Sequence, residues 1–401
     1  MSSLKRPAFT RFWIGETATV LAYQMLVVAV GWQTYDLTQS ALALGLIGLF
    51  HFSTQFTLLL PAGHFADRHD RRRIALGAQL VQLAVAAVYT GANLSGTMST
   101  AFIYGGSLFI GAAQAFQNPS IRSMLPTLVE RRELPQCIAW SGATRKMAVI
   151  AGPALGGLIY LAGPAYVYGT AAVFFVIAGM LLVSVKMPHA VRPHEPATLK
   201  TLFGGISYIR SNPVVLGAIS LDLFATLLGG ATALLPIYAR DILATGPSGL
   251  GVLRAAPAIG AIVVSAVLVR APLSRHVGRV MFTCVAVFGV GTVVFGLSSS
   301  FALSVTALGV LGAADMISVV IRTSLIQLET PDHMRGRVSS VNSMFTSTSN
   351  QLGQFESGVV AALVGTVPSV VIGGVGTLIV AAVWMKLFPA LYQRDQMTSV
   401  Q

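Results

Sequence analysis

The sequence predicts an all-α integral membrane protein of about twelve transmembrane helices, arranged as two six-helix bundles related by an internal repeat. Three observations support this fold class. Of 401 residues, 54% are hydrophobic and only 10% are charged, whereas soluble domains carry roughly a quarter charged residues. The apolar residues form long runs, and 18 or more in succession can cross the ~30 Å hydrocarbon core as a helix. Similar residue patterns recur in the two halves of the chain, as set out below.

The apolar runs place one helix in each of twelve stretches. Open sheets and loops cannot replace these helices, because their backbone groups would stay unsatisfied in lipid. We expect residues 1–190 to form the first bundle, 191–212 a polar, proline-containing cytoplasmic linker, and 213–401 the second bundle. The expected spans are residues 10–34, 42–63, 74–94, 101–122, 138–162, 166–187, 214–238, 249–269, 279–297, 301–325, 339–365 and 368–389.

Basic residues concentrate in alternate loops, as in Arg71–Arg73 and at Arg335 and Arg337, while the loops between them carry little charge. Because short cytoplasmic loops are rich in Lys and Arg, we expect both termini to be cytoplasmic. This asymmetry, with anionic lipid at the inner face, accounts for the net charge of +12. We therefore expect contact with membrane lipids and no nucleic-acid partner.

The two halves align at four separate places. These matches pair Gly111-Ala-Ala-Gln114 with Gly312-Ala-Ala-Asp315, Arg122 and Glu130 with Arg322 and Glu329, Gly152–Gly157 with Gly353–Gly358, and Glu16 with Asp222. Duplication of this kind is typical of transporters that move two bundles about a site near the membrane midplane.

The stretch from Gly63 to Arg73 resembles the signature that the major facilitator superfamily carries between its second and third helices. That signature has a glycine, then Asp-Arg, then Gly-Arg with another basic residue, and Asp70 here replaces the second glycine. A glycine allows close helix approach, and arginines can meet carboxylates and lipid phosphate. The resemblance implies the major facilitator fold and a conformational-gating role for Gly63, Asp67, Arg68, Arg71 and Arg72.

The segment Gly152-Pro153-Ala-Leu-Gly156-Gly157 resembles the glycine-proline motif of the exporting, antiporter branch of that superfamily. Small residues allow close helix packing and the proline bends the helix, so ordinary packing is the competing interpretation of Gly152, Pro153, Gly156 and Gly157. Further segments resemble an enterobactin-exporter-like group: Asn118-Pro119, Leu125-Pro126, 234–241 and 329–337.

Four acids lie inside the predicted spans, where an ionisable residue is costly and is by default a functional candidate. They are Glu16, Asp222, Asp315 and Glu356. The resemblance implies that the first, fourth, seventh and tenth helices line a central cavity, which would place three of the four there. We expect Glu16 and Asp222, then Asp315 and Glu356, to be proton-coupling candidates. Structural pairing of Glu16 and Asp222 with basic residues such as Arg11 is the alternative.

Polar residues within the spans are candidates for lining a substrate cavity. Arg145 and Lys146 would suit an anionic ligand, such as a catecholate or carboxylate siderophore, or would instead pair with Glu130 or an intramembrane acid. Spacings of three and four residues put members of the set on single helix faces. The candidates are Tyr23, Gln24, Gln114, Gln117, Asn118, Arg145, Lys146, Asn350 and Gln354.

Together these features predict a secondary active transporter that exports a siderophore or drug-like amphiphile across the cytoplasmic membrane of a bacterium, by proton antiport with alternating access. A lysophospholipid flippase of the same superfamily and a small-molecule importer are the alternatives. The sequence contains no Gly-x-Ser-x-Gly, His-Glu-x-x-His or phosphate-cradling motif. We therefore expect a monomeric carrier, not an enzyme, with no cofactor or metal and with the substrate, protons and lipids as partners.

Overall fold

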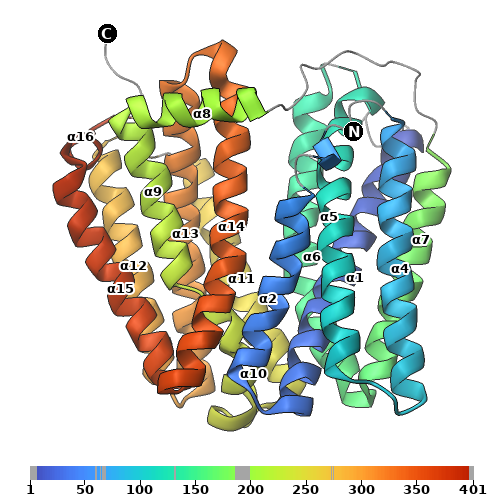
Figure 1. Ribbon diagram of the computed structural model, residues 1–401. Helices are drawn as coiled ribbons and strands as arrows, with labels where there is room; N and C mark the ends of the chain where they lie inside the picture. Colours follow the sequence, from blue (N-terminus) through green and yellow to red (C-terminus); the bar gives the residue numbers. More distant parts are fainter. Residues whose placement is uncertain are drawn as a thin grey trace. The chain divides into compact units, whose positions relative to one another are not determined.

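A computed structural model describes residues 7–58, 61–63, 65, 69–130, 132–185, 199–271, 273 and 275–396. This part of the chain is almost wholly helical and contains no β-strand (Figure 1). Eight segments are long and apolar enough to cross a membrane. They are α1 (Pro7–Thr38), α4 (Arg71–Leu94), α7 (Pro164–Val183), the interrupted segment Pro213–Ile242, α11 (Gly246–Arg270), α12 (Val277–Leu297), α13 (Phe301–Glu329) and α15 (Thr366–Leu387).

Four further helices coincide with the remaining predicted spans. One of them, α2 (Ala41–Thr57), is apolar but shorter. The other three exceed the ~20 residues that a span requires but are more polar: α5 (Thr100–Leu128), α6 (Leu134–Ile159) and α14 (Asp332–Val364). The predicted class, an all-α integral membrane protein, is confirmed.

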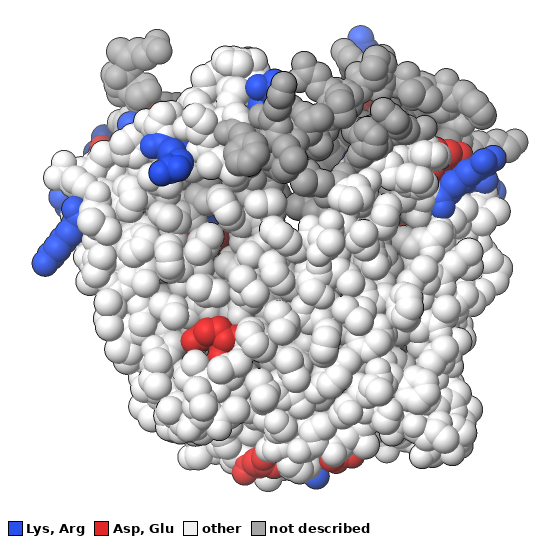
Figure 2. All heavy atoms as spheres, viewed as in Figure 1, with Lys and Arg blue, Asp and Glu red and all other residues white. Residues whose placement is uncertain are grey.

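The surface agrees with a membrane location. In Figure 2 the visible face is uncharged over a broad middle zone, broken by one acidic patch, and the other charged side chains gather toward two edges. Large apolar side chains are exposed on the outside of the helices, among them Leu80, Val88, Phe109, Val263 and Ile379. In lipid such residues need no cover, whereas in water they would form an aggregation-prone patch.

Contacts between Cα atoms divide the chain into two compact units. Unit 1 comprises Met1–Gln39, Leu46–Ala197 and Thr245–Ala255, and unit 2 comprises Ser40–Gly45, Thr198–Ala244 and Ala256–Gln401. The first turns of α11 thus pack within unit 1, and the first turns of α2 pack within unit 2.

The predicted linker, residues 191–212, is only partly described, and most of its described part is helical. Residues Leu199–Ser211 form the amphipathic helix α8. Ile206 and Ile209 of this helix pack in a cluster with Val215 and Val341, from α9 (Pro213–Leu228) and α14. In the sequence, the apolar residues of α8 directly follow a polar, proline-containing stretch, and the helix was therefore not predicted.

Glycine contacts repeat between the units with matching registers. A Cβ on Gly152 of α6 would lie 3.1 Å from Leu21 O of α1, and one on Gly353 of α14 would lie 2.7 Å from Leu227 O of α9. Gly157 packs against Pro247 O and Gly251 of α11, while Gly358 packs against Ala41 O and Gly45 of α2. The packing role of the glycine-proline motif is therefore present in both halves, although Pro153 and Gly156 occur only in the first.

The span that begins at Pro213 is interrupted where α14 lies closest to it. The helix α9 ends at Leu228, and after Gly229 and Gly230 the chain continues through a 3₁₀ turn (Ala231–Leu234), α10 (Leu235–Ile237) and a π-helical turn (Tyr238–Ile242). A Cβ on Gly230 would overlap Gly353 O and lie 2.7 Å from Ser357 Oγ. Gly230 is needed there because no side chain fits between the two segments, while a Cβ on Gly229 would overlap Phe288 of α12.

Short elements complete the described chain. A 3₁₀ turn (Tyr160–Ala162) follows α6, and α16 (Pro389–Tyr392) follows α15. After α16, Arg394 forms an ion pair with Glu329 at the end of α13. The carbonyls of Arg394 and Asp395 accept hydrogen bonds from Gly278 N (2.9 Å) and Val277 N (3.1 Å), so the C-terminal segment caps α12 within unit 2.

The matched glycine contacts predict matched effects of substitution. We expect Gly152→Val and Gly353→Val each to destabilise the folded protein by about 1–3 kcal/mol, because an added side chain forces packed helices apart. Gly142→Val in α6 is the control, since a Cβ there would meet no atom within 4 Å. Thermal unfolding in detergent measures the effect. Equal melting temperatures for all three variants would show that these contacts do not bear on stability.

Candidate functional site

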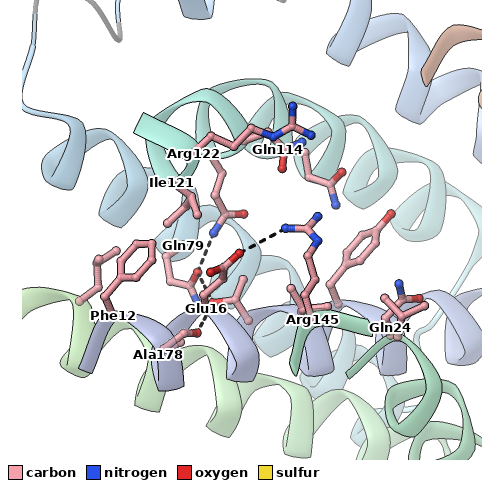
Figure 3. A pocket seen from close by; sticks show the side chains of 17 residues that line it. Phe12, Glu16, Gln24, Gln79, Gln114, Ile121, Arg122, Arg145 and Ala178 are labelled. Atoms are coloured by element: carbon pink, nitrogen blue, oxygen red, sulfur yellow. Dashed lines mark hydrogen bonds and ion pairs between the residues drawn. The ribbon is translucent and has the colours of Figure 1, made fainter. Parts of the chain in front are cut away.

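Unit 1 contains a cavity of about 140 Å³ between α1, α4, α5, α6 and α7 (Figure 3). Its wall is unusually polar for a membrane-spanning bundle. Six of the substrate-cavity candidates line it, namely Tyr23, Gln24, Gln114, Gln117, Asn118 and Arg145. The lining also includes Glu16 and Thr19, and two polar residues that were not singled out from the sequence as cavity residues, namely Gln79 and Arg122. Lys146 is not among the residues of this wall.

Glu16 and Arg145 form an ion pair across the cavity (Figure 3). Glu16 lies on α1 and Arg145 on α6, and 3.4 Å separates Glu16 Oε1 from Arg145 Nη1. That separation exceeds the ~2.7–2.9 Å of a strong charge-assisted hydrogen bond. The side chain of Glu16 is 14% exposed and that of Arg145 is 51% exposed. The pair is loose, and Arg145 keeps donors free for another group.

The partner of Glu16 is therefore Arg145, and not the suggested Arg11. Arg11 Nη1 instead donates to Ser184 O at 3.2 Å, near the end of α7.

A chain of glutamines forms one wall of the cavity. Gln82 Nε2 donates to Gln117 Oε1 (2.7 Å), Gln117 Nε2 donates to Gln79 Oε1 (3.0 Å), and Gln79 Nε2 donates to Phe175 O (3.2 Å). Thr19 Oγ1 also donates to Gln79 Oε1 at 3.2 Å. Both ends of the Gln117 amide are thus engaged, and the chain connects α1, α4, α5 and α7. Gln79 and Gln82 are three residues apart and therefore lie on one face of α4. This spacing is the feature of the sequence that could have identified the chain of glutamines.

Tyr23, His51 and Gln114 meet beside the cavity. The rings of Tyr23 and His51 pack edge to face at 6.5 Å, and Gln114 lies next to both side chains. His51 Nε2 is buried and makes no hydrogen bond to any residue that the structure describes. Arg254, from the first turns of α11, donates through Nη1 to Val27 O of α1 at 3.1 Å.

In unit 2 the acid equivalent to Glu16 has a different environment. Asp222 on α9 forms an ion pair with Arg322 on α13, and both side chains are buried. Arg322, near the end of α13, is therefore buried beside Asp222. Asp222 also lines a small cavity of about 20 Å³ with Cys284, Asp315 and Ser318. Asp315 forms no ion pair with a residue in the described ranges.

The remaining candidates of unit 2 lie on α14. Glu356 is half-buried and accepts a hydrogen bond from Ser357 Oγ at 3.4 Å. Asn350 is exposed and donates to Thr346 O at 2.8 Å, within its own helix. Gln354 is half-buried one turn further along.

The signature loop is described in part. Gly63 lies in a short helical turn, whereas Asp67 and Arg68 lie outside the described residues. Arg71 Nη1 donates to Ser123 O of α5 (3.2 Å), and Arg72 Nη1 donates to Val185 O after α7 (2.8 Å). Asp70, the departure from the signature, caps α4 by accepting a hydrogen bond from Arg72 N at 2.9 Å. These contacts tie the ends of α4, α5 and α7 together.

Comparison with known proteins agrees with this architecture. A family model described as a transmembrane secretion effector matches residues 1–400. An enterobactin exporter, EntS, of Citrobacter koseri is 28% identical over 399 residues, covering 98% of this chain and 94% of the relative. EntS of Shigella boydii is 26% identical over 397 residues, with the same coverage.

Two solved structures show the same fold at low sequence identity. A bacterial homologue of the human lysosomal transporter Spinster superimposes with a TM-score of 0.77 at 12% identity, covering 98% of each chain. The nucleoside transporter NupG superimposes with a TM-score of 0.70 at 13% identity, covering 95% of this chain and 99% of the other.

The two acid–arginine pairs predict different responses to neutralisation. Asp222→Asn should destabilise the protein by about 3–5 kcal/mol, because it leaves Arg322 buried without its counterion. Glu16→Gln should change stability by less than about 1 kcal/mol, since Arg145 is half exposed and screened. Thermal unfolding of the purified protein measures both.

A double variant serves as the internal control. Asp222→Asn with Arg322→Gln removes both charges and should recover part of the lost stability. If neutralising Glu16 and neutralising Asp222 cost the same, the contrast between the two pairs is wrong.

Proposed function

The chain belongs to the family of transmembrane secretion effectors within the major facilitator superfamily, and on that premise we propose that it exports a siderophore or a similar small molecule. It acts as a secondary active carrier and not as an enzyme. The observation that carries the proposal is the polar cavity of unit 1, with the Glu16–Arg145 pair inside an otherwise apolar helix bundle. Polar groups in a span are costly unless they serve a ligand or a structural partner.

The chemistry of this cavity fits a siderophore. Such molecules chelate iron through catecholate, hydroxamate or carboxylate oxygens, and Arg145 offers a planar fork of donors to oxygen pairs. Gln114, Asn118 and Gln24 add amide donors and acceptors to the wall. The two relatives named as enterobactin exporters support the same substrate class.

Export against a gradient needs a coupled ion, and we propose the proton. The membrane potential contributes about 2.3 kcal/mol per charge per 100 mV. Asp315 is the best-placed carrier, because it lines a small polar cavity and has no ion-pair partner within the described ranges. Glu16 and Glu356 follow. Asp222, buried with Arg322, acts mainly as a structural residue in this scheme.

The protein is a multi-pass membrane protein, and we place it in the cytoplasmic membrane of a bacterium, as a monomer with both termini inside. The basic residues at helix ends support this orientation. Arg71–Arg73 begin α4, Arg210 ends α8 and Arg270 ends α11. Arg71 donates to a carbonyl near the end of α5, and Arg72 donates to a carbonyl just after α7. These contacts support a gating role for the signature loop.

Everted membrane vesicles test transport and coupling together. Vesicles that contain the protein should accumulate enterobactin when the lumen is acidic, and a protonophore should abolish the accumulation. Asp315→Asn should reduce the accumulation to the level of vesicles without the protein, because the site can no longer release a proton.

Asp332→Asn is the matched control, since this acid is exposed at the start of α14 and pairs only with Arg335 of its own helix among the described residues. Full accumulation by Asp315→Asn would remove this residue from the coupling scheme. Accumulation that needs no pH gradient, or movement of lysophospholipid in place of the small molecule, would contradict proton-coupled export of a siderophore.

A further inference from the structure

The two units differ at a position where their repeat predicts the same pair. Glu16 and Asp222 occupy equivalent positions, and each unit carries an Ile-Arg dipeptide near the end of the equivalent helix, at Arg122 in α5 and Arg322 in α13. In unit 2 the acid and the arginine form a buried ion pair. In unit 1, Glu16 contacts Arg145, and Arg122 forms no ion pair or hydrogen bond with any described residue.

A shift of one residue accounts for the difference. Counted from the matching Gly111 and Gly312, Arg122 lies one residue further along its helix than Arg322. One residue rotates a side chain by about 100° around a helix. The extra residue falls in the segment of α5 that contains Pro119. Arg322 therefore points at Asp222. Arg122 points in a different direction, forms no ion pair with Glu16 and remains exposed.

Arg122 nevertheless borders the same cavity as Arg145. Both residues line it, and Figure 3 shows the Arg122 side chain extending over the space next to the Glu16–Arg145 pair. The position in unit 2 that corresponds to Arg145 is Thr346, by the same offset that relates Gly152 to Gly353. Among the described residues, the unit 1 cavity thus has two arginines beside one acid, whereas Asp222 in unit 2 has one arginine.

The charges of the two cavities therefore differ in sign. The unit 1 cavity has two guanidinium groups and one carboxylate, which leaves it net positive. The unit 2 cavity is lined by two acids, Asp222 and Asp315. Among the described residues, the cation that pairs with these acids is Arg322, which forms its ion pair with Asp222. A cleft lined by an excess of one charge attracts a ligand of the opposite charge.

We propose that Arg122 and Arg145 bind the anionic group of the transported molecule, a carboxylate or catecholate, and that Glu16 is the internal counterion which this group displaces from Arg145. The proposal rests on the export function above and assigns its substrate class. Two guanidinium forks suit paired oxygens, which they can bind bidentately. The loose 3.4 Å contact to Glu16 leaves room for the exchange.

The size of the cavity limits what this site holds. A cavity of about 150 Å³ accommodates one benzene ring, and the unit 1 cavity measures about 140 Å³. The site therefore fits a single aromatic acid or one arm of a larger molecule. Gln114 and Asn118 in the wall can meet hydroxyl groups next to the anion.

Salicylate and its neutral amide, salicylamide, are a matched pair of probes for this site. Titration calorimetry on the full-length protein in lipid nanodiscs should show tighter binding of salicylate than of salicylamide. Arg122→Gln and Arg145→Gln should each weaken salicylate binding about tenfold and leave salicylamide unchanged. Glu16→Gln should tighten salicylate binding several-fold, because it removes the competing carboxylate.

Arg270→Gln is the control, an exposed arginine at the end of α11 that should leave both probes unaffected. Arg122→Lys should retain part of the affinity because it keeps the charge. Each variant must match the unmodified protein in melting temperature within its error, so that a loss of binding is not a loss of fold. Unselective binding of the two probes, unchanged salicylate binding by Arg122→Gln, or weaker binding by Glu16→Gln would each overturn the proposal.

The vesicle assay separates this inference from the proposed function. Proton-driven export that is intact in Arg122→Gln overturns the anion site and leaves export standing. The expected binding pattern without any proton-driven accumulation by the unmodified protein overturns export and leaves the anion site standing.

Discussion

Every polar side chain within the spans must find its partner inside the protein, because the hydrocarbon core provides no hydrogen-bonding groups. Most of the polar residues described here satisfy this constraint. The Gln82–Gln117–Gln79 chain ends on a backbone carbonyl, and Asp222 and Arg322 neutralise each other. Against this background, the few polar groups that are not fully satisfied become informative. They include the loosely held Glu16, the exposed Arg122 and several buried side-chain atoms, among them His51 Nε2 and Ser141 Oγ.

Packing and chemistry have diverged to different degrees between the halves. The glycine contacts at Gly152 and Gly353, and at Gly157 and Gly358, use equivalent partners in both units, so the backbone framework is shared. The pairing of the ionisable residues on that framework differs between the units. Unit 1 combines two arginines with Glu16, whereas unit 2 places Asp315 where unit 1 has Gln114. This difference supports the proposed division of labour, in which unit 1 binds the anionic ligand and unit 2 binds the proton.

The fold could be predicted from the sequence because membrane spans depend on local composition. Each of the twelve apolar runs coincides with a helical segment, and eight of these segments are long and apolar enough to cross a membrane. The repeat was recognisable in motifs such as Gly111-Ala-Ala-Gln114. The polar faces were also partly predictable, since helical spacing put Gln114, Gln117 and Asn118 on one wall. Their partners were not, because pairing depends on the rotation and depth of neighbouring helices. Pairing of Arg145 with an intramembrane acid was one of the interpretations left open, but the sequence identified neither Glu16 as that acid nor Arg322 as the partner of Asp222. The amphipathic α8 was missed because a polar segment precedes it.

The central claim is that unit 1, through Arg122 and Arg145, receives the anionic group, while the equivalent position of unit 2 is closed by its own ion pair. A crystal structure of the protein with 5-iodosalicylate tests this claim most directly, because the anomalous signal of iodine locates the ligand. We predict an iodine peak in the unit 1 cavity with the carboxylate on Arg122 and Arg145, and Glu16 moved away from Arg145. A peak beside Arg322, or a unit 1 cavity without ligand at saturating concentration, would contradict the account.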